Sequence, residues 1–261
     1  MEQNRQSAGE EIANSALHSI GGLLGIAGLV LLVNHARSSL PVYVIFASAM
    51  ILMFAASAVY HGLCPQITKQ DGYAQKPQRT SSKTALIELF RTIDHQAIYI
   101  FIAGTYTPFC LLALKGTLGL ALLIFEWVLA LAGIILSAIK VRFLKKAEMV
   151  IFILMGWAIL AGCIPLARYL PLHGFILLFA GGLFYTAGTF FYRAGKARPA
   201  AVNPGISSES NPISKNDKFH HQPRIIKARK RTYGAHVVWH LFVMAGAACH
   251  WLSVWSLCRI R

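Results

Sequence analysis

Residues 40–63, LPVYVIFASAMILMFAASAVYHGL, contain no aspartate, glutamate, lysine or arginine. An α-helix rises about 1.5 Å per residue, so about 20 apolar residues cross the roughly 30 Å of hydrocarbon in a bilayer. The run shows neither the strict alternation of a half-buried strand nor the one-sided pattern of a helix on a soluble domain. It therefore predicts a helix that spans a membrane, with His61 near one end.

The composition of the whole chain agrees with this segment. Hydrophobic residues make up 56% of the 261 residues and charged residues 13%, whereas soluble domains carry about 25% charged residues. The net charge of +15 could indicate nucleic-acid binding. The basic residues lie between the apolar runs, however, where membrane orientation requires them, so we expect no nucleic-acid partner.

Seven apolar runs of sufficient length predict an all-α, seven-transmembrane helix bundle that forms a single membrane domain. The first eleven residues, MEQNRQSAGEE, lack the basic start of a signal peptide, so we expect the first run to be retained. The predicted spans are about 13–33, 40–63, 91–114, 117–139, 148–168, 170–192 and 234–257.

The distribution of lysine and arginine predicts the orientation of the bundle. With a cytoplasmic N-terminus, the cytoplasmic segments hold 20 of the 25 basic residues and the outer segments hold 5. Because basic residues concentrate in cytoplasmic loops, we expect the N-terminus inside and the C-terminus outside. With the apolar composition, this predicts an integral membrane protein.

The long loop 193–233 joins the last two predicted spans. Its middle, ARPAAVNPGISSESNP, is rich in proline, serine and asparagine, which predicts disorder. Its end at 224–231, RIIKARKR, has five basic residues in eight. This segment can act as an orientation signal, and it can also bind anionic lipid headgroups.

Four ionisable residues lie at similar depth near the predicted cytoplasmic surface. His61 ends the second span, which runs inward, while Asp94, His236 and His240 lie in the first turns of spans that start inside. Ionisable residues within spans are costly and commonly functional. A single histidine of this kind is more often a packed bundle residue than a metal ligand, but here three histidines and an aspartate share one depth.

The spacing of these residues favours a zinc site. His236 and His240 are separated by four residues and therefore share a helix face, as do Ser57 and His61. Three neutral imidazoles favour Zn²⁺ over Mg²⁺ or Ca²⁺, and three protein ligands leave a fourth position for water. We predict His61, His236 and His240 as metal ligands, with Asp94 as a general base and Ser57 beside them as catalytic residues.

Other polar residues have more open interpretations. His250 lies ten residues past His240, about 15 Å along the helix, so it cannot join the same site. Glu11, Asn14 and His18 share one helix face, and they either solvate the helix start or support the metal ligands. Glu126 lies in mid-span, where it is either a protonated, hydrogen-bonded acid or part of a polar route through the bundle.

Four ordered motifs resemble the haemolysin III family, which is related to the progestin and adipoQ receptors and, more distantly, to alkaline ceramidases. The motifs are E-x-x-N-x-x-x-H at 11–18, S-x-x-x-H at 57–61, D-H-x-x-I-Y-x-x-I-A-G-T-Y-T-P at 94–108 and H-x-x-W-H-x-x-x-x-x-x-x-x-x-H at 236–250. The resemblance covers nearly the whole chain and implies zinc held by His61, His236 and His240, with Asp94 contacting it through water.

The resemblance implies a location in a bacterial inner, or plasma, membrane, and it implies several functions. The ceramidase relatives imply zinc-dependent hydrolysis of a lipid amide or ester, with membrane lipid as substrate. A non-enzymatic regulator or sensor of membrane lipid homeostasis, with structural zinc, is the alternative. The third function is a pore-forming haemolysin, although the apolar helices show little sign of an aqueous lumen. The sequence does not specify an oligomeric state.

Overall fold

The computed structural model describes residues 6–36, 38–71, 82–139, 142–195 and 234–260, and regular structure within these ranges is entirely helical. The long loop from 196 onward, with the basic segment 224–231, lies outside the described residues. The elements are, in order, α1 (Ala8–His35), α2 (Leu40–Asp71), α3 (Ser82–Pro108), the π-helix η1 (Phe109–Leu114), α4 (Gly116–Ala138), α5 (Arg142–Trp157), the 3₁₀-helix η2 (Ala158–Gly162), α6 (Cys163–Tyr169), α7 (Leu172–Gly195) and α8 (Ala235–Ile260).

These elements form seven segments that are long and apolar enough to span a membrane, which confirms the predicted all-α, seven-span architecture. Each predicted run coincides with one segment. The fifth segment, Ala147–Tyr169, is not one regular helix, because α5 passes through η2 into α6. The third segment likewise continues from α3 into the π-helix η1.

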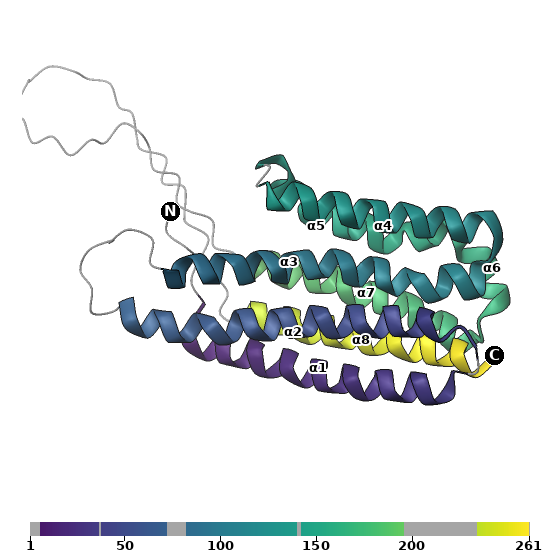
Figure 1. Ribbon diagram of the computed structural model, residues 1–261, viewed down its shortest axis with the longest axis horizontal. Coiled ribbons are helices and arrows are strands. Elements are labelled where there is room, and N and C mark those ends of the chain that lie inside the picture. The colour runs from purple at the N-terminus through teal and green to yellow at the C-terminus, as the bar shows by residue number, and fades with distance from the viewer. Residues whose placement is uncertain (1–5, 37, 72–81, 140–141, 196–233, 261) are drawn as a thin grey trace, which may run out of the picture.

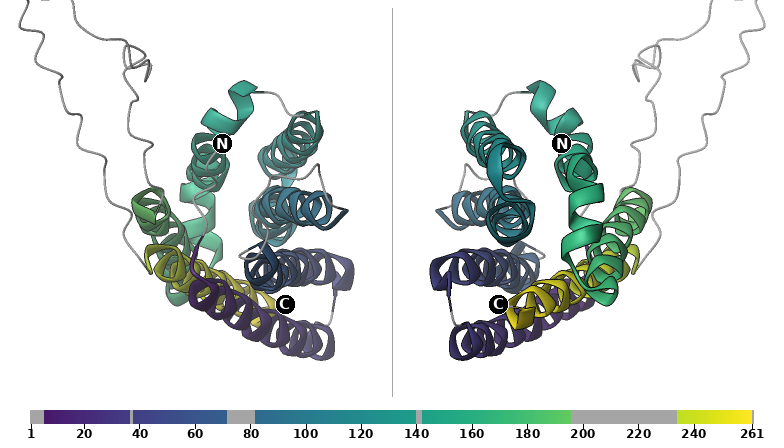
Figure 2. Two further views of the ribbon diagram at one scale, coloured as in Figure 1. Left: turned by 90° about the vertical axis from the view of Figure 1, so that its left-hand side faces the viewer. Right: turned by 90° about the vertical axis from the view of Figure 1, so that its right-hand side faces the viewer.

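The helices run side by side along the long axis of the bundle (Figure 1). Neighbours in the chain pack together from α1 through α4, α7 packs along α8, and α8 returns to α1. The end views show α4 and α5 on the side away from α1 and α8 (Figure 2). Because α1 and α8 are neighbours, residues from the two ends of the chain meet in one place.

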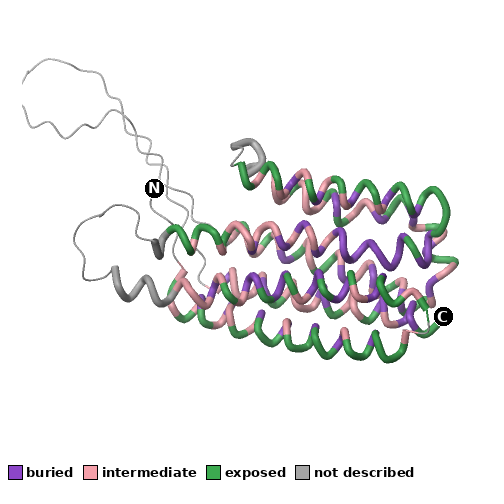
Figure 3. Tube along the Cα trace, viewed as in Figure 1, coloured by how far each residue is buried: buried purple, intermediate pink, exposed green. Residues whose placement is uncertain are grey.

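The exposure pattern is that of a protein solvated by lipid. Large apolar side chains cover the outside, among them Leu23 and Leu24 on α1 and Leu131 and Ile135 on α4. Ionisable side chains such as Glu11 and Glu126 are buried instead. Buried positions concentrate on the inward faces of the helices (Figure 3). Apolar atoms outside and polar groups inside are what a bilayer requires, so the chain is an integral membrane protein.

Glycines on α1 bring this helix close to its neighbours. A Cβ at Gly21 would meet the Phe54 ring at 2.8 Å, and one at Gly25 would meet Ile51 at 3.0 Å. Small residues let membrane helices approach closely, since packing rather than the hydrophobic effect holds them together. The face that carries these glycines also carries Glu11, Asn14 and His18. The close contact between α1 and α2 therefore places these polar residues beside the end of the second span.

Candidate metal centre

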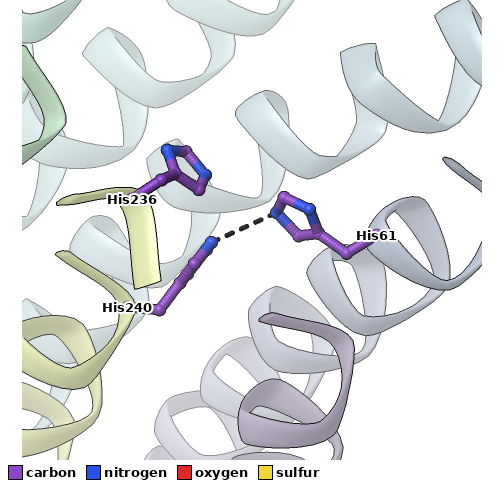
Figure 4. Close-up of side chains that lie close together, drawn as sticks. All are labelled: His61, His236 and His240. Carbon is purple, nitrogen blue, oxygen red and sulfur yellow. Dashed lines mark hydrogen bonds between the residues drawn. The ribbon is translucent and has the colours of Figure 1, made fainter. Parts of the chain in front are cut away.

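Three histidines from α2 and α8 point toward one another (Figure 4). One ring nitrogen of each lies within 4.8 Å of those of the other two, and the Nε2 atoms of His61 and His240 are 3.1 Å apart. His61 and His240 are each 1% exposed, while His236 is half-buried. The structure thus brings the three predicted ligands, His61, His236 and His240, into one group that could hold a metal ion. We refer to this group as the histidine cluster.

Glu11 of α1 holds the far side of the His61 ring. Its Oε2 atom lies 2.6 Å from Nδ1 of His61, and both side chains are buried. An ionised carboxylate only accepts hydrogen bonds, so Nδ1 of His61 carries the proton and Nε2 presents a lone pair. Metal-binding histidines commonly donate their second N–H to a carboxylate, which orients the ring. Glu11 therefore orients His61 with its free nitrogen toward the cluster.

The start of α1 is fixed by a capping box. The Ser7 hydroxyl accepts a hydrogen bond from the Glu10 N–H at 3.2 Å, and Glu10 Oε2 accepts one from the Ser7 N–H at 2.8 Å. The other Glu10 oxygen accepts the N–H of Gly234, just before α8, at 2.7 Å. Glu10 thus joins the starts of α1 and α8, and the next residue, Glu11, reaches His61.

Asp94 of α3 and Ser57 of α2 lie beside the histidine cluster, and both are buried. The Asp94 carboxylate interacts electrostatically with His61 and lies close to the Ser57 hydroxyl. The Ser57 hydroxyl makes no hydrogen bond to any of the described residues. His95, next in the chain, places Nδ1 3.0 Å from the carbonyl oxygen of Arg91 on its own helix and 3.7 Å from Oδ2 of Asp94.

His18 packs against the cluster from α1. Its ring is 2% exposed and meets the His240 ring edge-on, with 4.1 Å between centroids. Neither of its ring nitrogens has a hydrogen-bond partner. Asn14, one turn nearer the start of α1, donates a hydrogen bond to Oε1 of Gln6 at 2.8 Å. Two of the three residues on the predicted polar face of α1, Glu11 and His18, therefore contact the histidine cluster.

Aromatic rings flank His236. Its ring centroid lies 4.9 Å from that of Trp239 and 5.9 Å from that of Tyr192, at the end of α7. The sequence analysis includes Trp239 in the H-x-x-W-H motif, between its two histidines, but assigns it no role. It does not identify Tyr192. Tyr192 lies far away in the sequence at the edge of an ordinary apolar run, and no sequence signal points to it.

Two other ionisable residues of the spans lie outside the cluster. His250 places Nε2 3.1 Å from the Leu178 carbonyl oxygen and packs edge-on against Tyr185. It therefore contacts α7, as expected for a histidine ten residues past His240. Glu126 is 0% exposed on α4, and neither carboxyl oxygen has a hydrogen-bond partner among the described residues. Within this part of the chain, the hydrogen bond expected of a protonated Glu126 is absent.

The fold and the cluster together define a class: a seven-helix integral membrane protein with a buried group of histidines contributed by its second and last spans. The family described as haemolysin-III related matches residues 78–251. The chain belongs to the haemolysin III family.

Two bacterial relatives match almost end to end. Hemolysin-3 of Bacillus cereus is 33% identical over 260 residues, which cover 97% of this chain and 94% of that protein. The Hemolysin-3 homolog of Bacillus subtilis (strain 168) is 33% identical over 254 residues, or 95% of this chain and 94% of that one. The human monocyte to macrophage differentiation factor is 25% identical over 167 residues, 64% of this chain and 55% of that protein.

Proposed function

We propose that this protein is a zinc-dependent hydrolase that acts on a lipid amide or ester. The observation that carries the proposal is the meeting of three imidazoles with a buried carboxylate from another helix, Asp94. A metal with three protein ligands keeps a position for a reactant, whereas structural zinc sites are closed by four. The donor set and the nearby carboxylate together resemble a hydrolytic centre.

The geometry of the cluster suits zinc. Two imidazole nitrogens at about 2.0–2.1 Å from a tetrahedral Zn²⁺ stand about 3.3 Å apart. The Nε2 atoms of His61 and His240 are 3.1 Å apart, so these two ligands are already near the required spacing. The two pairings that involve His236 lie within 4.8 Å, so His236 needs only a small movement. Three nitrogen donors favour Zn²⁺ over Mg²⁺ or Ca²⁺, which prefer oxygen.

The protein's own residues supply the remaining roles. Bound zinc would polarise a carbonyl group and acidify a water molecule. Asp94 would accept the proton of the attacking water and pass it to the leaving group, since it is buried beside the cluster and the other nearby carboxylate, Glu11, is engaged with Nδ1 of His61. Ser57 would orient Asp94 or the substrate, because its unpartnered hydroxyl lies close to the Asp94 carboxylate.

A lipid substrate fits the location of the site. The cluster lies within the apolar bundle near the starts of α1 and α8, at the depth where a lipid amide or ester bond would lie. By the distribution of basic residues, this end faces the cytoplasm of a bacterial inner membrane, and the segment 224–231 would bind anionic headgroups there.

The test uses purified full-length protein loaded with zinc and a panel of ceramides, acyl amides and lipid esters. We expect release of fatty acid by the wild type, and loss of turnover with retained zinc in Asp94→Asn. His240→Ala should lose both zinc and turnover. A zinc-loaded wild type that leaves every lipid of the panel intact would contradict the proposal.

The burial of the cluster favours a second function, a regulator of membrane lipid homeostasis with structural zinc. His61 and His240 are each 1% exposed, and a structural metal needs no access for a reactant. In this case Asp94→Ala keeps zinc, stability and the cellular phenotype, whereas His61→Ala loses all three. The Asp94 substitution therefore separates the two functions.

A further inference from the structure

Glu126 lies in the middle of a stripe of small residues on α4. The buried positions of this helix are Gly119, Leu122, Glu126, Ala130 and Gly133. They recur every three or four residues and form one face, which packs on α3 and η1. Glu126 is the only ionisable residue in the helix. One carboxyl group is therefore held in a face that otherwise contains only glycine, alanine and leucine.

The helix α4 packs closely against the third span on both sides of Glu126. A Cβ at Gly119 would collide with the carbonyl oxygen of Cys110, and a Cβ at Gly133 would collide with the Tyr99 ring. Both residues lie on the third span, in η1 and α3, so α4 lies directly against a backbone carbonyl group on one side of Glu126 and against an aromatic ring on the other. Ala103 and Ala130, in the same contact, are 0% and 1% exposed. The contact thus shields the carboxyl group from lipid and from bulk water.

The nearby hydrogen-bond donors already have other acceptors. The Tyr106 hydroxyl, which lies near enough to Glu126 to interact electrostatically, is 2.6 Å from the Met155 carbonyl oxygen and 2.8 Å from the Ile159 N–H. It therefore donates to the first group and accepts from the second. The Trp127 N–H donates to the Thr107 hydroxyl at 3.4 Å, which itself donates to the Ala103 carbonyl at 3.2 Å.

The other titratable groups that face α4 would not compensate a negative charge on Glu126 either. The Cys110 thiol of η1 interacts electrostatically with Glu126 but makes no hydrogen bond to it. The Tyr99 hydroxyl lies two turns away and interacts with Glu148 of α5. Among the residues that the structure describes, no lysine, arginine or histidine interacts with the Glu126 carboxyl group.

An ionised carboxylate in this setting would be buried without a cation or a donor, which is strongly unfavourable. A metal cation would need several oxygen ligands, and the neighbouring oxygens are already engaged. We propose that Glu126 is an intramembrane proton-binding site, occupied at neutral pH and distinct from the histidine cluster. The irregular helices η1 and η2, which both contact α4, provide the local departures from α-helix through which the proton can exchange.

A neutral carboxylic acid in an apolar setting has a diagnostic reaction with dicyclohexylcarbodiimide. The carboxyl oxygen bonds to the central carbon of the reagent, and the acid proton moves to one reagent nitrogen. The acyl group then migrates to the other nitrogen and leaves a stable N-acylurea with no group lost. An ionised carboxylate lacks the proton that this addition consumes, so the adduct reports protonation.

The experiment treats the full-length protein in lipid bilayers with dicyclohexylcarbodiimide and locates the adduct by peptide mass spectrometry. We expect modification at Glu126, at a rate that falls about tenfold per pH unit above the titration midpoint. Half-exposed Glu88 should stay unmodified, and a water-soluble carbodiimide should not reach Glu126. The Glu126→Gln protein should fold normally and lose the adduct.

Two outcomes would overturn the proposal. The first is absence of the adduct at neutral pH in folded wild type, which would show that the carboxylate is ionised by a partner. The second is equally rapid modification of Glu126 in denatured protein at the same pH, which would show that the folded environment does not hold the proton. The wild-type experiment decides both even if a variant fails to fold. His240→Ala should give the wild-type adduct, so the result is independent of zinc.

Discussion

The histidine cluster and Glu126 are two buried polar regions of one bundle, and they differ in how their polar groups are compensated. In the cluster, His61 has Glu11 at 2.6 Å on one nitrogen and His240 at 3.1 Å on the other. At Glu126, neither carboxyl oxygen has a hydrogen-bond partner in the part of the chain that the structure describes. The cluster forms where α1 and α8 begin, so several helices contribute polar side chains there. The α4 face is filled by small residues, so the charge itself must be removed by a proton.

The substitution with the largest expected effect removes a ligand from the cluster. We expect His240→Ala to reduce bound zinc from about one per chain to near zero, because two nitrogens cannot retain the ion against competing ligands. It should also remove the stabilisation by bound metal, about 4 kcal/mol at a metal concentration a thousandfold above Kd. Elemental analysis and thermal unfolding with and without zinc measure these effects.

The control for this substitution is His250→Ala, since His250 contacts α7 and not the cluster. It should keep its zinc. Equal zinc loss in His240→Ala and His250→Ala would mean that zinc binding does not depend specifically on the histidine cluster.

Glu11→Gln should weaken zinc binding about 10- to 100-fold, which is typical when the partner of a metal-bound histidine is changed. An amide in place of the carboxylate no longer fixes the proton on Nδ1 of His61. Glu10→Gln is the matched control, because Glu10 bonds Gly234 rather than a histidine. Competition with a chelator of known affinity measures both. Equal affinity in Glu11→Gln and wild type would contradict the assigned role.

Gly133→Ala should destabilise the bundle by about 1–3 kcal/mol, because the added methyl group must displace the buried Tyr99 ring. Gly156→Ala adds the same methyl group where nothing lies within 4 Å, and it should change stability little. Unfolding in mixed micelles compares the two variants. Zinc binding should be unchanged in both, and a loss of zinc in Gly133→Ala would show that the α4 contact influences the cluster.

Tyr106→Phe should have the smallest effect, about 1–2 kcal/mol of stability, because it leaves the Ile159 N–H without its side-chain acceptor. The carbodiimide adduct at Glu126 should persist, since this hydroxyl donates to Met155 and not to the carboxyl group. Loss of the adduct in this variant would show that Tyr106 helps to hold the proton.

Much of the fold and of the histidine cluster could be predicted from the sequence. Long uncharged runs such as 40–63 require helices in a bilayer, because backbone groups cannot remain unpaired there. Span order placed His61, His236 and His240 near one end, and helical spacing separated His250 from them. The break of the fifth span at η2 was not predicted, since the apolar run continues through it without interruption. The approach of Tyr192 to His236 was also missed, because it depends on how α7 packs along α8.

The sequence alone determined the number of spans and the shared location of the three histidines, because hydrophobic length and helical periodicity are local properties. It left open which groups compensate the buried charges. Only the tertiary structure decided that Glu11, rather than Asp94, contacts a ring nitrogen of His61 and that Glu126 faces α3 without a partner. Both results depend on which helix faces meet, and on α1 and α4 those faces are set by the close packing of glycines against neighbouring helices.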